Sequence, residues 1–227
     1  MNRPYIICHM VTSLDGKVTG KFLYEPQCEK ATEAYYQINR DYKADGFACG
    51  RVTMEGSFTG GWYPDLSEFA PCYSPMDYLP DDIGDFFAVA FDPHGRLGWK
   101  SSRIIDDDPG YGGAQIIEVL THQVSRQYLT YLQSMDIPYI FAGDTEIDIE
   151  EALSKLKAYF GINKLLLEGG QYPERYLPAG RCHRRSEPCG SPHRRRCGGQ
   201  AAVHGCPAGT LHAGRCPIPQ RYPLAEL

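Results

Sequence analysis

The chain is organised around one stretch, Ile162-Asn163-Lys164-Leu165-Leu166-Leu167-Glu168-Gly169-Gly170. Three consecutive leucines bounded by turn residues predict a strand that is buried on both faces, as in the middle of a parallel sheet. The paired glycines let the backbone bend sharply and bring its N–H groups close to a bound anion. Because ligands of open α/β sheets gather at the carboxyl ends of the strands, this turn is a candidate ligand site, although a plain Gly-Gly turn explains the same residues.

Strand-like and helix-like segments alternate before this stretch. Further strands are expected at residues 5–11, 45–50, 85–91, 114–121 and 138–142. Helices are expected at residues 26–43, 124–135 and 149–160, because apolar side chains recur there at helical spacing or charged residues mark the helix ends. This alternation predicts an α/β domain with a mostly parallel central sheet flanked by helices.

Length and composition narrow the classes of protein. A chain of 227 residues with 42% hydrophobic residues can form one α/β domain, or one domain and a tail. No apolar run approaches the length of a membrane span and the first residues do not resemble a signal peptide, so we expect a cytoplasmic protein without a membrane partner. Through Gly170 the chain has 14 Lys+Arg against 25 Asp+Glu, a net charge of -11, which argues against nucleic acid as the main partner. The histidines lack metal-ligand spacing, so no metal is expected.

Glycine turns follow three of the expected strands. Gly50-Arg51-Val52-Thr53 joins a strand to a helix start, where backbone N–H groups, a guanidinium and a hydroxyl can bind phosphate. A capped helix with a solvated arginine explains the same residues. Gly143-Asp144 and Gly169-Gly170 end two later strands. Because parallel strands end at one rim, the three turns together indicate a nucleotide site, although neither G-x-G-x-x-G nor a Walker P-loop is present.

Four segments occur in an informative order: Ser13-Leu14-Asp15-Gly16-Lys17, Gly50-Arg51-Val52-Thr53-Met54-Glu55, Asp92-Pro93-His94-Gly95-Arg96-Leu97 and Leu165-Leu166-Leu167-Glu168-Gly169-Gly170. Together they resemble the reductase domain of riboflavin biosynthesis (the RibD C-terminal family), which has the dihydrofolate-reductase-like fold. The resemblance covers about residues 3–170. It implies NADPH as the hydride donor, and it implies that the cofactor is held by Gly50, Arg51, Thr53, Gly143, Asp144, Gly169 and Gly170.

The resemblance also implies where a small-molecule substrate would lie. His9 and Ser13 would contact the substrate, and either Asp15 or Glu168 would relay the proton that accompanies the hydride. The family typically carries a lysine where His9 aligns, and a histidine is a less constant cation at neutral pH. The reaction implied is the reduction of 5-amino-6-(5-phosphoribosylamino)uracil. Dihydrofolate or another small molecule remains an alternative substrate, and a catalytically inactive nucleotide-binding protein is a further alternative.

From Gln171 onward the composition shifts to arginine, proline, glycine, cysteine and histidine, without lysine or aspartate. We therefore expect residues 1–170 to form the reductase domain and residues 171–227 to form an atypical, disordered tail without strands. The C-terminal strands of the fold would then be missing or replaced, and the homodimer common in the family would be in doubt.

Two explanations of this tail remain open. A metal-binding tail would use cysteines such as Cys182, Cys189 and Cys197, but their gaps include no C-x-x-C pair. Alternatively, another reading frame of GC-rich coding sequence yields this mixture, and we hypothesise a frameshift near the codons of Gly169 to Tyr172. Resequencing tests the hypothesis, which an intact frame in independent isolates would contradict.

Overall fold

The computed structural model describes residues 2–18, 20–73, 75–169 and 201–205. Its strands and main helices, in chain order, are β1 (Tyr5–Ser13), α1 (Glu29–Tyr42), β2 (Gly46–Gly50), α2 (Arg51–Met54), β3 (Phe87–Phe91), β4 (Gln115–Leu120), α3 (Arg126–Ser134), β5 (Tyr139–Phe141), α4 (Ile149–Phe160), β6 (Lys164–Leu167) and β7 (Ala201–Gly205). Short 3-10 turns lie at Lys21–Tyr24, Pro26–Cys28 and Leu66–Glu68, and a π-helical turn at Glu55–Thr59 continues α2.

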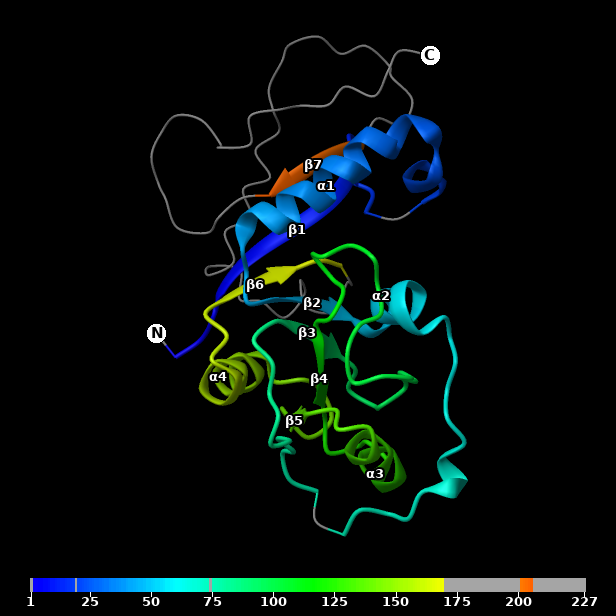
Figure 1. Cartoon of the computed structure of the whole chain (residues 1–227), viewed down its shortest axis with the longest axis vertical. Coiled ribbons are helices and arrows are strands. Elements are labelled where there is room, and N and C mark those ends of the chain that lie inside the picture. Colours follow the sequence, from blue (N-terminus) through cyan, green and yellow to red (C-terminus); the bar gives the residue numbers. More distant parts are fainter. Residues whose placement is uncertain (1, 19, 74, 170–200, 206–227) are drawn as a thin grey trace.

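The strands form one sheet in the order β5-β4-β3-β2-β6-β1-β7 (Figure 1). Neighbouring strands from β5 to β1 are all parallel, and β7 pairs antiparallel with β1. The predicted α/β class with a mostly parallel sheet is therefore confirmed, and the arrangement is consistent with a dihydrofolate-reductase-like fold. The three-leucine strand β6 lies between β2 and β1, with Leu166 opposite Ile7 and Phe47. Its central position is the one that the continuous apolar run predicts.

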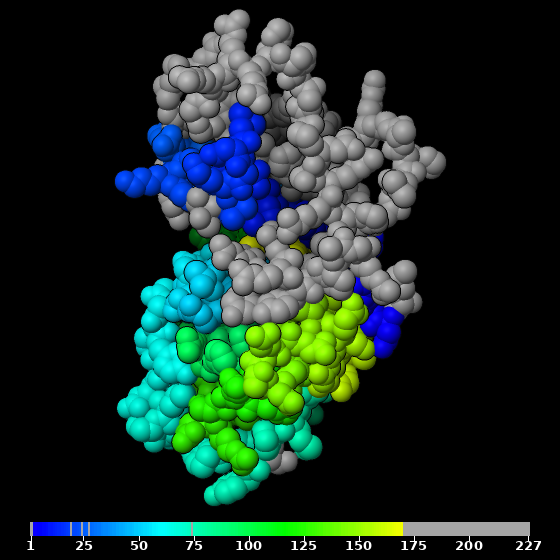
Figure 2. All heavy atoms as spheres, turned by 180° about the vertical axis from the view of Figure 1, so that it is seen from behind, coloured from blue at the N-terminus to red at the C-terminus, as the bar shows by residue number. Residues whose placement is uncertain are grey.

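Two hydrophobic cores lie on the two faces of this sheet. One core contains Leu166 together with Leu129 and Leu132 of α3, and Tyr35 of α1 packs against it. The other contains Leu165 and the apolar side of α4. Successive residues of β6 thus point to opposite faces, as the pleat of a strand requires. Figure 2 shows the molecule from behind, and the yellow-green atoms of the segment that contains α4 are visible on that side.

The ends of α4 follow from its sequence. The Asp148 side chain accepts a hydrogen bond from the backbone N–H of Glu151 at 3.0 Å, which caps the first turn. Gly161 ends the helix in the left-handed region at φ 68°. The predicted range of residues 149–160 is confirmed. The predicted helix at residues 26–43 is a 3-10 turn followed by α1, which ends where Lys43 adopts φ 45°.

One expectation about the last part of the chain is wrong. Residues 201–205 form strand β7, which pairs along β1 from His9 opposite Gly205 to Ser13 opposite Ala201. The sequence shows no alternating apolar run there, and the strand was missed because an edge strand can pair through its backbone N–H and C=O groups, which any side-chain pattern supplies. The remainder of the predicted tail, residues 171–200 and 206–227, lies outside the described residues. In the described part, no helix has the length and apolar character needed to cross a membrane.

Candidate functional site

The predicted site residues that the structure describes, apart from His9, lie at or just after the rim where the parallel strands end. Ser13 is the last residue of β1 and Asp15 follows it, while Gly50 ends β2 and Arg51 begins α2. The remaining members follow β5 and β6: Gly143, Asp144, Glu168 and Gly169. Gly170 lies outside the described residues.

The turns after β2 and β6 touch each other. The backbone N–H of Gly50 donates to the carbonyl oxygen of Gly169 at 3.2 Å. Gly169 has φ 120°, and a Cβ at this position would lie 3.0 Å from Thr53 Oγ1. Both the backbone conformation and the space thus require a glycine. The N-cap of α2 is Gly50, which has no side chain to cap the helix, so among the described residues no N-cap side chain satisfies the N–H groups of the first turn.

Arg51 is the cation of this junction, and it already has a partner. Its Nη1 lies 2.6 Å from Glu55 Oε2, an ion pair between residues four apart on consecutive helical turns. The Arg51 side chain is 29% exposed. A phosphate bound here would therefore share the guanidinium with Glu55.

The Gly143 turn lies farther along the same rim. Since β2 and β5 are separated by β3 and β4, Gly143 is about three strand spacings, roughly 14 Å, from Gly50. A Cβ on Gly143 would lie 2.1 Å from the carbonyl oxygen of Glu146, so the turn itself requires the glycine. Its N–H donates to Glu151 Oε2 at 3.1 Å. A ligand would contact this turn chiefly through residues beside the glycine, such as Asp144, which is exposed.

The turn after β1 is held by its own polar side chains. Ser13 Oγ donates to Asp15 Oδ1 at 2.5 Å, and the Lys17 ammonium lies 2.8 Å from Asp15 Oδ2. Hydrogen bonds from Lys17 and then from Ser13 lower the pKa of the Asp15 carboxyl. Because Asp15 is exposed, solvent screens these contacts. Asp15 is thus held as a carboxylate at neutral pH.

Glu168 and His9 form a buried pair beneath α1. His9 Nδ1 lies 2.6 Å from Glu168 Oε1, and the side chains are 0% and 2% exposed. The two residues come side by side because β1 and β6 are in register up to Cys8 and Leu167. His9 thus reaches the acid that ends the central strand. The roles of His9 in substrate contact and of Glu168 in proton relay stay predictions.

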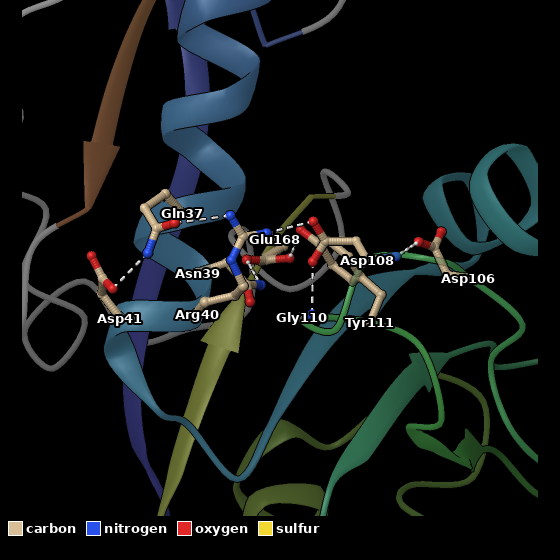
Figure 3. A network of polar contacts seen from close by, with 9 residues as sticks. All are labelled: Gln37, Asn39, Arg40, Asp41, Asp106, Asp108, Gly110, Tyr111 and Glu168. Atoms are coloured by element: carbon tan, nitrogen blue, oxygen red, sulfur yellow. Dashed lines mark hydrogen bonds and ion pairs between the residues drawn. The ribbon is translucent and has the colours of Figure 1, made fainter.

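Two further side chains bind Glu168, and the sequence did not single them out (Figure 3). Asn39 Nδ2 donates to Glu168 Oε1 at 2.8 Å, and the Tyr111 hydroxyl donates to Oε2 at 2.9 Å. Burial and then the charge of Glu168 raise the pKa of Tyr111, so the hydroxyl keeps its proton. The sequence does carry a signal for Asn39: it is a polar residue four positions after Tyr35, on the face of α1 that otherwise places apolar side chains inward. Tyr111 lies in a loop with no such signal.

The imidazole of His9 is sandwiched within the core. Tyr35 stacks on it with 4.1 Å between ring centroids and 4° between the planes, and Tyr42 meets it edge-on at 6.0 Å. The Nε2 atom of His9 is buried without a hydrogen-bond partner among the described residues. Nδ1 is therefore bound to Glu168, whereas Nε2 can still bind a group from outside the described residues. Tyr35 of α1 thus packs on a polar residue of β1.

No group of three or more His, Cys, Asp or Glu side chains within the described ranges could hold a metal ion. The site is instead an assembly of backbone turns at the rim and a buried acid–histidine pair just below it.

Comparison with known proteins shows a similarity of structure but no match of sequence. No protein-family model matches the chain, and no curated protein matches it significantly. Among solved structures, the chain is similar to a pyrimidine reductase-like protein from Corynebacterium diphtheriae, with 17% sequence identity and a TM-score of 0.42. The similarity covers 73% of this chain and 63% of that protein, so the chain spans less than two thirds of the length of that structure.

Proposed function

We propose that the chain is an NADPH-dependent reductase of a small cyclic substrate, of the type that reduces 5-amino-6-(5-phosphoribosylamino)uracil. The observation that carries the proposal is the contact between the turns after β2 and β6. Gly169 approaches Thr53 so closely that a side chain would fill the gap, and the Gly50 N–H bonds to the Gly169 carbonyl. Such a cradle of glycine backbone beside a helix start fits a phosphate group.

A bound dinucleotide would extend along this rim. The phosphates would lie on the uncapped first turn of α2, near Arg51 and the Thr53 hydroxyl. The rest of the cofactor would follow the strand ends towards Gly143 and Asp144 at β5. When bound, NADPH supplies the hydride, while the protein aligns the reactants and excludes water.

The buried pair would provide the polar groups near the reacting centre. Glu168 accepts hydrogen bonds from His9, Asn39 and Tyr111, so its carboxylate is fixed in position. His9 Nε2 is the polar atom in this group without a partner in the described chain, and it would bind or protonate a substrate atom. Ser13 would contact the substrate at the end of β1.

The burial of His9 and Glu168 favours a second candidate function, in which the protein binds a nucleotide but catalyses no reaction. His9 lies fully enclosed under Tyr35, and Glu168 has its oxygens occupied. A substrate could then reach Nε2 only if α1 moved. The rim would still bind a nucleotide in that case.

Fluorescence titration with NADPH tests the proposal. We expect saturable binding by the whole chain and about fivefold to tenfold weaker binding by Thr53→Val, which removes one hydroxyl at nearly constant volume. Thr130→Val on α3 makes the same change away from the rim and should bind as the wild type does. Absence of saturable binding in the wild type would overturn the proposal. Binding without oxidation of NADPH by any pyrimidine or pterin substrate would favour the non-catalytic candidate.

A further inference from the structure

A second hollow lies at the opposite rim of the sheet. A pocket of about 310 Å³ is lined by Gly46, the first residue of β2, and by Phe86, which directly precedes β3. It is therefore at the amino ends of these strands, whereas the candidate nucleotide site is at their carboxyl ends. The last turn of α1 and the loop at residues 109–110 complete the walls. Pockets of this size hold small-molecule ligands.

The inner wall of the pocket is apolar and partly aromatic. Phe47 and Leu166 come from neighbouring strands and are buried, and Phe86 is half-buried. The rings of Phe47 and Phe86 lie 6.3 Å apart at 52° to each other. Such tilted rings offer both a face and an edge to a third ring. A planar ring is the shape that this wall favours.

Asn39 supplies a polar atom to the pocket. The residue is only 5% exposed, and its Nδ2 donates to Glu168 Oε1 at 2.8 Å. Since a carboxylate only accepts hydrogen bonds, the amide nitrogen must face Glu168, which leaves Oδ1 on the other side. Oδ1 accepts no hydrogen bond within the described ranges, and it lies beside Gly110, where a Cβ would be 2.5 Å away (Figure 3). Because Asn39 lines the pocket, a ligand N–H or O–H can donate to this oxygen.

The charged residues of the pocket differ in their availability. Arg40 Nη1 lies 2.5 Å from Asp108 Oδ2, so this guanidinium is already paired. Lys43 is exposed and makes no ion pair with any described residue. It lies just after the last turn of α1, where its φ of 45° fixes the chain direction. Lys43 is thus the cation that can receive an anionic group at the mouth of the pocket.

We propose that this pocket binds a small aromatic acid that carries a hydroxyl or amine on its ring. The ring packs against Phe47 and Phe86, the ring donor bonds to Asn39 Oδ1, and the carboxylate lies near Lys43. The pocket lies at the other end of the strands from Gly50 and Gly169 and shares Asn39 with the buried Glu168 pair, and the proposal stands whether or not that rim binds NADPH.

Calorimetric titration of the whole chain with 4-hydroxybenzoate tests the proposal. We expect saturable binding at submillimolar concentration, at least fivefold tighter than that of benzoate, which lacks the ring donor. Lys43→Asn removes the cation but tolerates the left-handed backbone, and it should weaken binding at least threefold. Lys30→Asn makes the same change at the other end of α1 and should leave binding unchanged.

A second pair of variants probes the floor of the pocket. Gly110→Ala places a methyl group against Asn39 Oδ1 and should weaken binding at least tenfold. Gly56→Ala meets nothing within 4 Å and serves as its control. If Gly110→Ala fails to fold, the two lysine variants decide. Absence of saturable heat in the wild type, or equal affinities for the wild type and Lys43→Asn, would overturn the proposal.

Discussion

Glu118 on β4 is an acid in a site that disfavours its charge. It is fully buried, and Oε1 accepts hydrogen bonds from Trp99 Nε1 at 2.5 Å and from the Tyr128 hydroxyl at 3.3 Å. Oε2 has no partner among the described residues. Burial and then the negative charge of Asp92 raise the pKa of Glu118 well above its usual value. The folded protein therefore favours the neutral acid.

The sign of the resulting pH dependence follows from proton counting. In the unfolded chain Glu118 has the ordinary pKa near 4.5. Above this pH the unfolded chain releases the proton while the folded protein retains it, so unfolding becomes easier as pH rises. The stabilisation that Glu118 gives the folded protein by keeping its proton is fully present below pH 4.5. It is lost as pH rises towards the raised pKa of Glu118 in the folded protein. Within that window the free energy of unfolding falls by about 1.4 kcal/mol per pH unit.

Glu118→Gln should remove this part of the pH dependence. Glutamine keeps an oxygen that can accept from Trp99, but it cannot titrate. We expect the free energy of unfolding, measured with urea between pH 5 and pH 7, to fall less steeply by about 1.4 kcal/mol per pH unit. Some slope remains, because burial also raises the pKa of Asp92. Glu33→Gln, an exposed change on α1, should keep the wild-type slope, and an unchanged slope in Glu118→Gln would refute the reasoning.

Three further substitutions have expected costs in urea unfolding. Gly169→Ala should cost about 1–3 kcal/mol, because φ 120° strains an alanine and its Cβ meets Thr53; little change would mean that the turn relaxes. Tyr111→Phe removes a donor from buried Glu168 and should cost about 1–3 kcal/mol, and a smaller loss would indicate that water replaces the hydroxyl. Leu166→Ala should cost about 2–5 kcal/mol, whereas Leu79→Ala at a partly exposed site should cost far less.

The parts of the fold that follow local patterns were predictable. The apolar run Leu165–Leu167 identifies a central strand because only a strand covered on both faces can bury every side chain. The bounds of α4 follow from a capping aspartate and a terminal glycine that act within one turn. The shared rim also follows, because strands joined through helices run parallel and end on one side. These signals need no knowledge of distant contacts.

The contacts between distant segments were not predictable from single stretches. Tyr111 reaches Glu168 from a loop 57 residues earlier in the chain. Asn39 reaches the same acid from α1, and only the packing of that helix on β1 and β6 brings them together. Strand β7 likewise depends on an open edge of β1 and not on its own pattern. Each of these features is decided by what the sheet places beside the residue.

The two acids that the sequence leaves equivalent differ once their surroundings are compared. Asp15 lies in solvent beside Lys17, its pKa is lowered, and it therefore carries no proton at neutral pH. Glu168 lies in the core, where its Oε1 is 2.6 Å from His9 Nδ1 and both side chains are closed off from solvent. A general acid must hold its proton at the working pH. If the rim binds NADPH, Asp15 would therefore act on the substrate only through its charge and hydrogen bonds, which leaves the His9–Glu168 pair as the candidate source of the proton that accompanies the hydride.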